Sequence, residues 1–89
     1  MKRWTAERAV GTIYRLRANK VENATAEQLN LMRKIFVQIT VFGELRYDSF
    51  NFMVWEDKDC NLAIIDYVLG EVSVLYSGLR YVIENRDEG

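Results

Sequence analysis

The last third of the chain carries apolar residues at alternating intervals of three and four. Polar or small residues follow the same spacing on the opposite side, so two complementary seams run for about six helical turns. This pattern predicts a helix over residues 60–86, roughly 40 Å long at the helical rise of about 1.5 Å per residue. The apolar seam consists of Leu62, Ile65, Leu69, Val72, Tyr76, Leu79 and Ile83.

A competing interpretation of this region is a β-meander. The stretches 71–74 and 82–83 are rich in residues that favour strands. On this alternative the chain is an α+β protein, with two N-terminal helices followed by a small antiparallel sheet.

A second helix is predicted over residues 26–46. Thr25 and Gln28 have the spacing of a capping box, in which each side chain bonds the other residue's backbone amide. The apolar stripe that follows is Leu29, Met32, Ile35, Phe36, Ile39, Phe42 and Leu45. Residues 35–42 also alternate like a strand, which makes the middle of this helix its weakest part.

A first helix is predicted over residues 5–21, with a short connection at 22–24 that favours an antiparallel hairpin with the second. Gly11 lies in its middle and costs about 1 kcal/mol relative to alanine, which suggests that another backbone approaches closely there. The chain contains no proline to interrupt a helix. We therefore expect one all-α domain over residues 1–89, an antiparallel three-helix bundle with a short irregular or helical segment at 47–57.

Length and composition limit the classes of protein to consider. A chain of 89 residues allows one domain. No apolar stretch approaches the ~18 residues that cross a bilayer, and the charged N-terminus lacks the apolar core of a signal peptide. The single cysteine, Cys60, is compatible with a reducing compartment. These features predict a cytoplasmic protein that does not bind membranes.

The charges are distributed unevenly although the net charge is only −1. Residues 1–46 carry nine basic and four acidic side chains, a net charge of +5, whereas residues 47–89 carry three basic and nine acidic ones, a net charge of −6. This asymmetry favours attraction between the two halves, because the chain has no dense basic run. The alternative is a nucleic-acid-binding regulator whose anionic partner contacts Arg8, Arg15 and Lys20.

Catalytic chemistry has little support in the sequence. The chain has no histidine and no phosphate-binding glycine loop. The acids Glu56, Asp57, Asp59 and Asp66 could serve a carboxylate-only hydrolase, but solvated surface acids explain them equally. We expect no enzyme activity and no cofactor.

One short motif resembles the start of a calcium loop. Residues 57–61 read D-x-D-x-N, but the glycine and glutamate that a calcium loop needs are replaced by Leu62 and Val68. We interpret the acids as a capping cluster at the start of the third predicted helix, and expect no metal.

Surfaces are therefore the place to look for function. Four aromatic residues, Tyr47, Phe50, Phe52 and Trp55, lie within nine positions and are predicted to bind a partner protein. The small residues Gly70, Ser73 and Ser77 would form a seam on the third helix that allows a homodimer. The function predicted by elimination is a small regulator or inhibitor that blocks another protein, such as a phage- or mobile-element-type inhibitor of host machinery, an analogy of size and composition alone.

Overall fold

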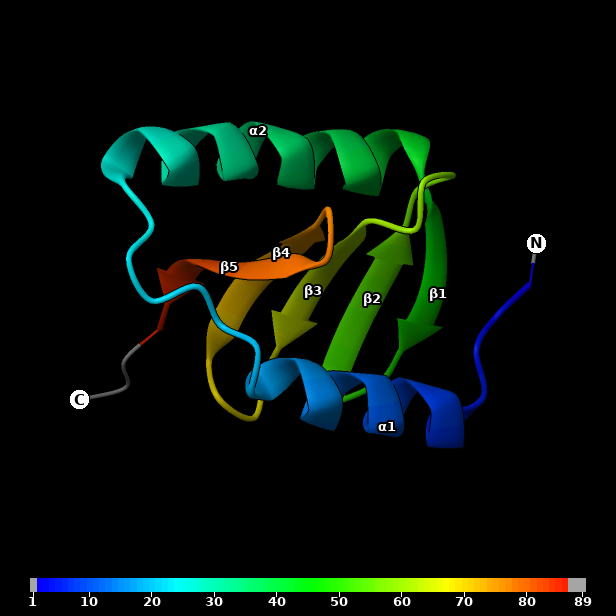
Figure 1. The fold of residues 1–89 in the computed structure, drawn as a ribbon. Helices are drawn as coiled ribbons and strands as arrows, with labels where there is room; N and C mark the ends of the chain where they lie inside the picture. The colour runs from blue at the N-terminus through cyan, green and yellow to red at the C-terminus, as the bar shows by residue number, and fades with distance from the viewer. Residues whose placement is uncertain (1, 87–89) are drawn as a thin grey trace.

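The computed structural model describes residues 2–86 and contains two helices followed by an antiparallel sheet (Figure 1). The elements are α1 (Ala6–Arg17), α2 (Ala26–Phe42), β1 (Glu44–Asp48), β2 (Phe52–Glu56), β3 (Leu62–Asp66), β4 (Glu71–Tyr76) and β5 (Leu79–Asn85). The five strands pair in chain order, so the sheet is a meander. The protein is therefore α+β, and the predicted three-helix bundle is wrong.

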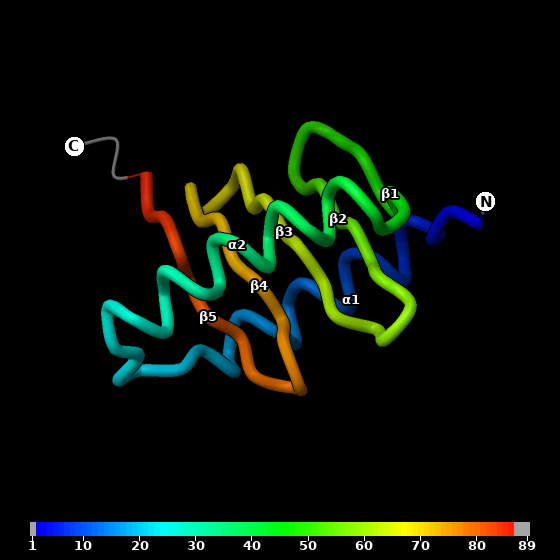
Figure 2. Tube along the Cα trace, turned by 90° about the horizontal axis from the view of Figure 1, so that it is seen from above, coloured from blue at the N-terminus to red at the C-terminus, as the bar shows by residue number. Residues whose placement is uncertain are grey.

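The two helices cover opposite faces of the sheet (Figures 1 and 2). α1 crosses one face, the link 18–25 passes the edge at β5, and α2 returns across the other face to β1. The core under α1 joins Trp4, Ala9, Ile13 and Leu16 to Phe52, Val54, Leu62 and Ile64. The core under α2 joins Met32 and Ile39 to Ala63, Val74, Tyr81 and Ile83. The helices run in opposite directions, as a hairpin would, but with the sheet between them.

α1 spans the sheet from one edge to the other. Its 12 residues make a helix of about 18 Å, and five strands make a sheet about 19 Å across. Hydrogen bonds attach both flanks of the helix to edge strands. The Trp4 amide donates to the Arg46 carbonyl of β1 over 2.7 Å, and the Val21 amide donates to the Arg80 carbonyl of β5 over 2.8 Å.

The predicted helix over 60–86 is replaced by β3, β4 and β5. Because helices cover both faces of the sheet, neighbouring apolar residues such as Leu62, Ala63 and Ile64 are all buried, and the period of two is lost. The polar seam that suggested a helix consists partly of turn residues. Ser77 and Gly78 have φ values of 51° and 82°, the left-handed pair that a two-residue hairpin turn requires.

Both N-terminal helices exist but are shorter than predicted. The capping box of α2 is confirmed, with Thr25 and Gln28 bonded reciprocally over 2.9 and 3.0 Å. α2 ends at Phe42, and Gly43, which caps it, passes close to other backbone. A Cβ at Gly43 would lie 2.5 Å from the Ile39 carbonyl oxygen and 2.6 Å from that of Glu56. At Gly11 nothing lies within 4 Å of such a Cβ, so the close approach expected there is wrong.

The unassigned segment 47–57 contains the end of β1, a turn and β2. Its residues alternate between the two faces of the sheet. Phe52 and Val54 face α1, whereas Trp55 faces α2. This alternation explains how so many large side chains are accommodated in a short segment.

Both edge strands are interrupted by a bulge. The register places one extra residue in β1 at Arg46 and one in β5 at Ile83. The Arg46 guanidinium also bonds the Lys2 carbonyl oxygen over 2.8 Å, and the Arg33 guanidinium of α2 bonds the Ile83 carbonyl oxygen over 3.1 Å. Bulges and bound arginines make an edge a poor template for an added strand. In the part of the chain that the structure describes, neither helix has the length and apolar character needed to cross a membrane.

Candidate functional site

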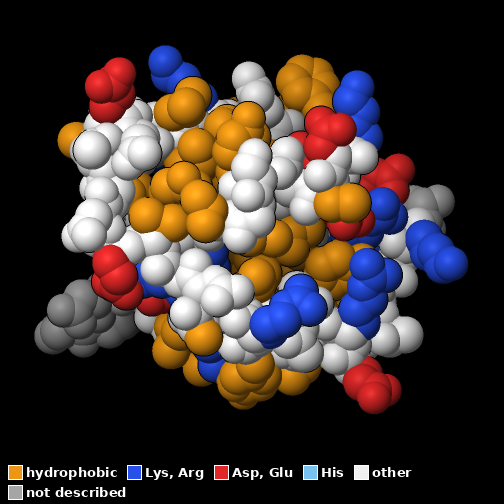
Figure 3. Space-filling view, in the orientation of Figure 1, with side chains coloured by type: hydrophobic (Ala, Val, Ile, Leu, Met, Phe, Trp, Pro, Cys, Tyr) orange, Lys and Arg blue, Asp and Glu red, His pale blue; other side chains and the backbone are white. Residues whose placement is uncertain are grey.

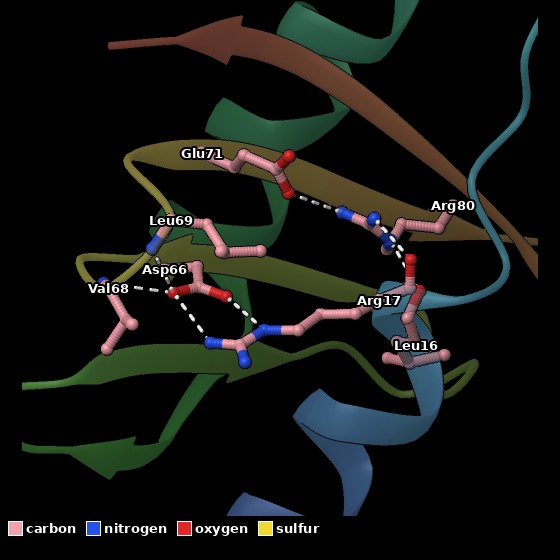
Figure 4. A network of polar contacts seen from close by, with 7 residues as sticks. All are labelled: Leu16, Arg17, Asp66, Val68, Leu69, Glu71 and Arg80. Carbon is pink, nitrogen blue, oxygen red and sulfur yellow. Dashed lines mark hydrogen bonds and ion pairs between the residues drawn. The ribbon is translucent and has the colours of Figure 1, made fainter. Parts of the chain in front are cut away.

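An ion pair joins α1 to the turn between β3 and β4 (Figure 4). The Arg17 guanidinium donates two hydrogen bonds to the Asp66 carboxylate, over 3.0 and 3.3 Å. Asp66 Oδ1 also accepts from the backbone amides of Val68 and Leu69, each over 3.0 Å. The hydrogen bonds to Asp66 are the main reason that the pKa of Arg17 is raised above its ordinary value. This one carboxylate therefore fixes both the end of α1 and the course of the turn.

A second arginine holds the C-terminal end of α1. The Arg80 guanidinium donates to the carbonyl oxygens of Leu16 and Arg17, over 2.6 and 3.2 Å, and to Glu71 over 3.1 Å. It thus adds hydrogen bonds to the last carbonyl groups of α1, of which that of Leu16 also accepts from the Asn19 amide. Among residues 2–86, no buried side-chain nitrogen or oxygen lacks a hydrogen-bond partner. The polar groups of this network therefore bond one another, and the network joins α1 to the sheet.

The β3–β4 turn presents three apolar side chains to solvent. Tyr67, Val68 and Leu69 are each 45–59% exposed. The Tyr67 amide donates to the Asn51 carbonyl oxygen over 2.9 Å, so this turn is bonded to the neighbouring β1–β2 turn. The Tyr67 hydroxyl also contacts Met53 Sδ at 3.2 Å. A hollow of about 330 Å³ lies beside the turn, reaching to Asn85 and Arg86.

The β1–β2 turn presents one further aromatic ring. Phe50 is 99% exposed. Its turn is fixed by Ser49, whose hydroxyl oxygen accepts from the amides of Asn51 and Phe52 over 3.1 and 3.2 Å. We call the exposed residues Phe50, Tyr67, Val68 and Leu69 the turn surface. Its side chains are apolar and exposed, but the backbone that carries them is held by hydrogen bonds.

The structure separates the four aromatic residues predicted to bind a partner. Phe52 is buried under α1, and Tyr47 packs against the same core. Trp55 packs edge-on against Phe36 of α2, with ring centroids 6.2 Å apart. Phe50 is the member of this set that solvent reaches freely. Sequence reasoning missed Tyr67, Val68 and Leu69, because these apolar residues were assigned to a helix.

The predicted self-association seam is not formed. Gly70 lies in the β3–β4 turn with φ of 69°, Ser73 is buried within β4, and Ser77 lies in the β4–β5 turn. The seam required the helix over 60–86, and without it these residues do not form a continuous face.

The basic candidates Arg8, Arg15 and Lys20 are all exposed, on α1 and the link that follows it. The Arg8 guanidinium lies 4.5 Å from the centroid of the Trp4 ring. Within residues 2–86, none of the three belongs to an ion pair. Figure 3 shows Lys and Arg side chains towards its lower right, where α1 and the segment before it lie.

The two halves of the chain do attract each other at particular places. Arg17 pairs with Asp66, and Arg46 pairs with Glu56 over 2.9 Å. Both pairs join a basic residue of the first half to an acid of the second. The other three ion pairs among residues 2–86, Arg46–Glu44, Arg80–Glu71 and Arg86–Glu84, each lie within one half of the chain.

The D-x-D-x-N motif forms the loop between β2 and β3 and does not begin a helix, so its interpretation as a helix cap is wrong. The Asp57 carboxylate accepts from the amides of Asp59 and Asn61, each over 2.9 Å, and from the Asn61 side chain over 3.1 Å. Asp57 thereby stabilises the loop in the manner of an Asx turn. No group of three or more potential acidic, histidine or cysteine ligands gathers anywhere in the described chain.

The turn surface combines exposed apolar side chains, fixed turns and a neighbouring hollow. Such an arrangement can bind an apolar surface. The chain matches no protein-family model, no curated protein and no solved structure. The evidence for the candidate site therefore comes from the geometry of its residues.

Proposed function

We propose that this chain is a non-enzymatic protein-binding module, a regulator or inhibitor that covers part of a partner protein with its turn surface. The observation that carries the proposal is the complete exposure of Phe50 on a turn held by Ser49. Burying a phenylalanine side chain contributes about 2 kcal/mol. A buried aromatic anchor is the kind of residue that dominates protein interfaces.

The fixed backbone of the turn surface supports the same proposal. Association is opposed by the entropy lost when loops become ordered. The Ser49 and Asp66 hydrogen bonds fix the two turns before any partner binds, and the bond from Tyr67 to Asn51 links them. Less entropy remains to be lost on binding.

Three of the four acids that could have supported catalysis are engaged elsewhere. Glu56 pairs with Arg46, Asp66 pairs with Arg17, and Asp57 holds its own loop. These contacts favour a binding role in which the protein acts by occupying a surface. The exposed thiol of Cys60 fits a reducing compartment such as the cytoplasm. We also expect a homodimer, though not through residues 70, 73 and 77.

The proposal is tested by affinity capture from a nuclease-treated lysate, followed by mass spectrometry. We compare the wild-type chain with Phe50→Asp and with a matched control, Leu79→Asp, which changes an exposed apolar residue in another hairpin. We expect Phe50→Asp to lose the captured protein and Leu79→Asp to retain it, with the circular dichroism of both unchanged. Equal capture by both variants would contradict the proposal.

Repeating the capture from an untreated lysate tests the nucleic-acid alternative. A partner recovered only without nuclease, and lost in the double variant Arg8→Glu with Arg15→Glu, would favour a basic binding face. That result would overturn the turn surface as the functional site.

A further inference from the structure

A small cavity lies between the C-terminal end of α1 and the sheet. Its volume is about 10 Å³, and four polar residues line it together with three aliphatic ones. The polar residues are Arg17 of α1, Asp66 of β3, Ser73 of β4 and Arg80 of β5. Asp66, Ser73 and Arg80 are buried, with at most 4% of each residue exposed. The cavity is therefore a polar space inside the protein.

The size of the cavity limits what it can hold. One water molecule needs about 10–15 Å³, measured for a water-sized sphere, and two to four polar partners. The four polar residues of the lining can supply such partners. The volume leaves no room for a larger molecule.

The Ser73 hydroxyl lies outside the hydrogen-bond network that joins α1 to the sheet. Ser73 pairs with Ile64 in the ladder of β3 and β4, and it lines the cavity on the side of the sheet that α1 covers. None of the hydrogen bonds that Arg17, Asp66 and Arg80 make in this network involves Ser73. A hydroxyl in apolar surroundings is costly unless it is hydrogen-bonded. A molecule in the cavity would provide a partner for it.

The Asp66 carboxylate can accept one more hydrogen bond. Its Oδ1 atom accepts from Arg17 and from the amides of Val68 and Leu69. Within residues 2–86, its Oδ2 atom accepts only from Arg17 Nε. A carboxylate oxygen offers about two lone-pair sites. Oδ2 can therefore bind a donor in the cavity.

The charges around the cavity balance (Figure 4). Arg17 pairs with Asp66 over 3.0 Å, and Arg80 pairs with Glu71 over 3.1 Å. An ion in the cavity would add an unpaired charge inside the protein, which is costly. The lining therefore favours a neutral molecule that both donates and accepts hydrogen bonds.

We infer that one water molecule is bound in this cavity as a part of the fold, hydrogen-bonded to the Ser73 hydroxyl and the Asp66 carboxylate. Such a water molecule donates to Asp66 Oδ2 and accepts from the Ser73 hydroxyl, and so adds Ser73 to the network. The site does not rest on the proposed function, because none of its polar residues belongs to the turn surface.

Oxygen-17 relaxation dispersion of the solvent tests for this water molecule in solution. The method detects water oxygens that stay bound for longer than the protein takes to tumble, and exchanging hydroxyl or guanidinium protons do not imitate them. We compare the wild-type chain with Ser73→Val, whose larger apolar side chain fills the cavity. The matched control is Thr12→Val, which removes a hydroxyl of α1 that does not line the cavity.

We expect Ser73→Val to lower the dispersion by the contribution of one water molecule and Thr12→Val to leave it unchanged. A wild-type chain without a long-lived water molecule would overturn the inference. An undiminished dispersion in Ser73→Val, or an equal decrease in both variants, would overturn it as well.

A crystal structure of the wild-type chain, at a resolution that shows ordered water, tests the position of the site whether or not a variant folds. We expect an electron-density peak about 2.5–3.0 Å from both Ser73 Oγ and Asp66 Oδ2, the distance of a hydrogen bond between oxygens. A cavity without density, or one filled by a shifted arginine side chain, would contradict the inferred site.

Discussion

Arg17 of α1 and Asp66 at the end of β3 are 49 positions apart in the chain and joined by two hydrogen bonds. The same carboxylate holds the amides of Val68 and Leu69. The position of α1 and the shape of the turn surface are thus coupled through one side chain. Phe52 adds a cation–π contact, with its ring centroid 5.8 Å from the Arg17 guanidinium carbon.

Asp66→Asn should lower the free energy of unfolding by about 2 kcal/mol, between the values for exposed and fully buried ion pairs. Asparagine cannot neutralise the partly buried Arg17 guanidinium. Urea unfolding measures the change, and hydrogen exchange at residues 67–69 reports the loosening of the turn. Unchanged stability together with unchanged exchange would show that Asp66 does not couple the two elements.

The contribution of Arg17 should not vary with pH in the neutral range. Its pKa in the folded state is raised above its ordinary value, so its stabilising effect is fully present at any pH below that ordinary value. The effect is lost only as the pH rises through the higher folded pKa. The destabilisation caused by Arg17→Met, measured by urea unfolding, should therefore be equal at neutral and at mildly alkaline pH. A difference that shrinks at mildly alkaline pH would contradict this assignment.

Two glycines should respond in opposite ways to alanine. Gly11 lies at an exposed position of α1 with open space around it, so Gly11→Ala should raise the free energy of unfolding by about 1 kcal/mol. Gly43→Ala places a methyl group against two backbone carbonyls, so it should lower the free energy by about 2 kcal/mol. Thermal unfolding of the pair measures both. Destabilisation by Gly11→Ala would contradict the open space that surrounds Gly11 in this fold.

Two phenylalanines of the same segment should differ in how much their truncation lowers the free energy of unfolding. Phe52 is 3% exposed, and Phe52→Ala should cost about 3 kcal/mol or more. Phe50→Ala should change stability by no more than about 0.5 kcal/mol, because its ring contacts solvent. Urea unfolding distinguishes them. Similar losses at both positions would mean that Phe50 is packed, and would remove it as an anchor.

The sequence predicts the N-terminal half of the fold better than the C-terminal half. The capping box of Thr25 and Gln28 is a local signal, and its helix starts where expected. The sequence does not predict the strands β3 to β5, because the burial of their side chains depends on elements that are distant in the chain. Ala63 is buried by α2 and Ile64 by α1, so no single period marks the sheet. The Ser77–Gly78 pair was the local signal of a hairpin within the mistaken helix.

The candidate site, too, is predicted from the sequence only in part. Phe50 belongs to the aromatic set predicted from the sequence, but its exposure depends on which neighbours the sheet buries. Tyr67, Val68 and Leu69 join it only because Asp66 and Asn51 hold the two turns together. Apolar residues alone do not distinguish a core position from a surface anchor.

The most direct test of the turn surface is site-specific photo-crosslinking in cells. A photoreactive phenylalanine analogue replaces Phe50 in one variant and Leu79 in the other. We predict that position 50 gives a covalent adduct with one protein and that position 79 gives none. An adduct absent from position 50, or formed equally at position 79, would contradict the proposal that this chain acts through its turn surface.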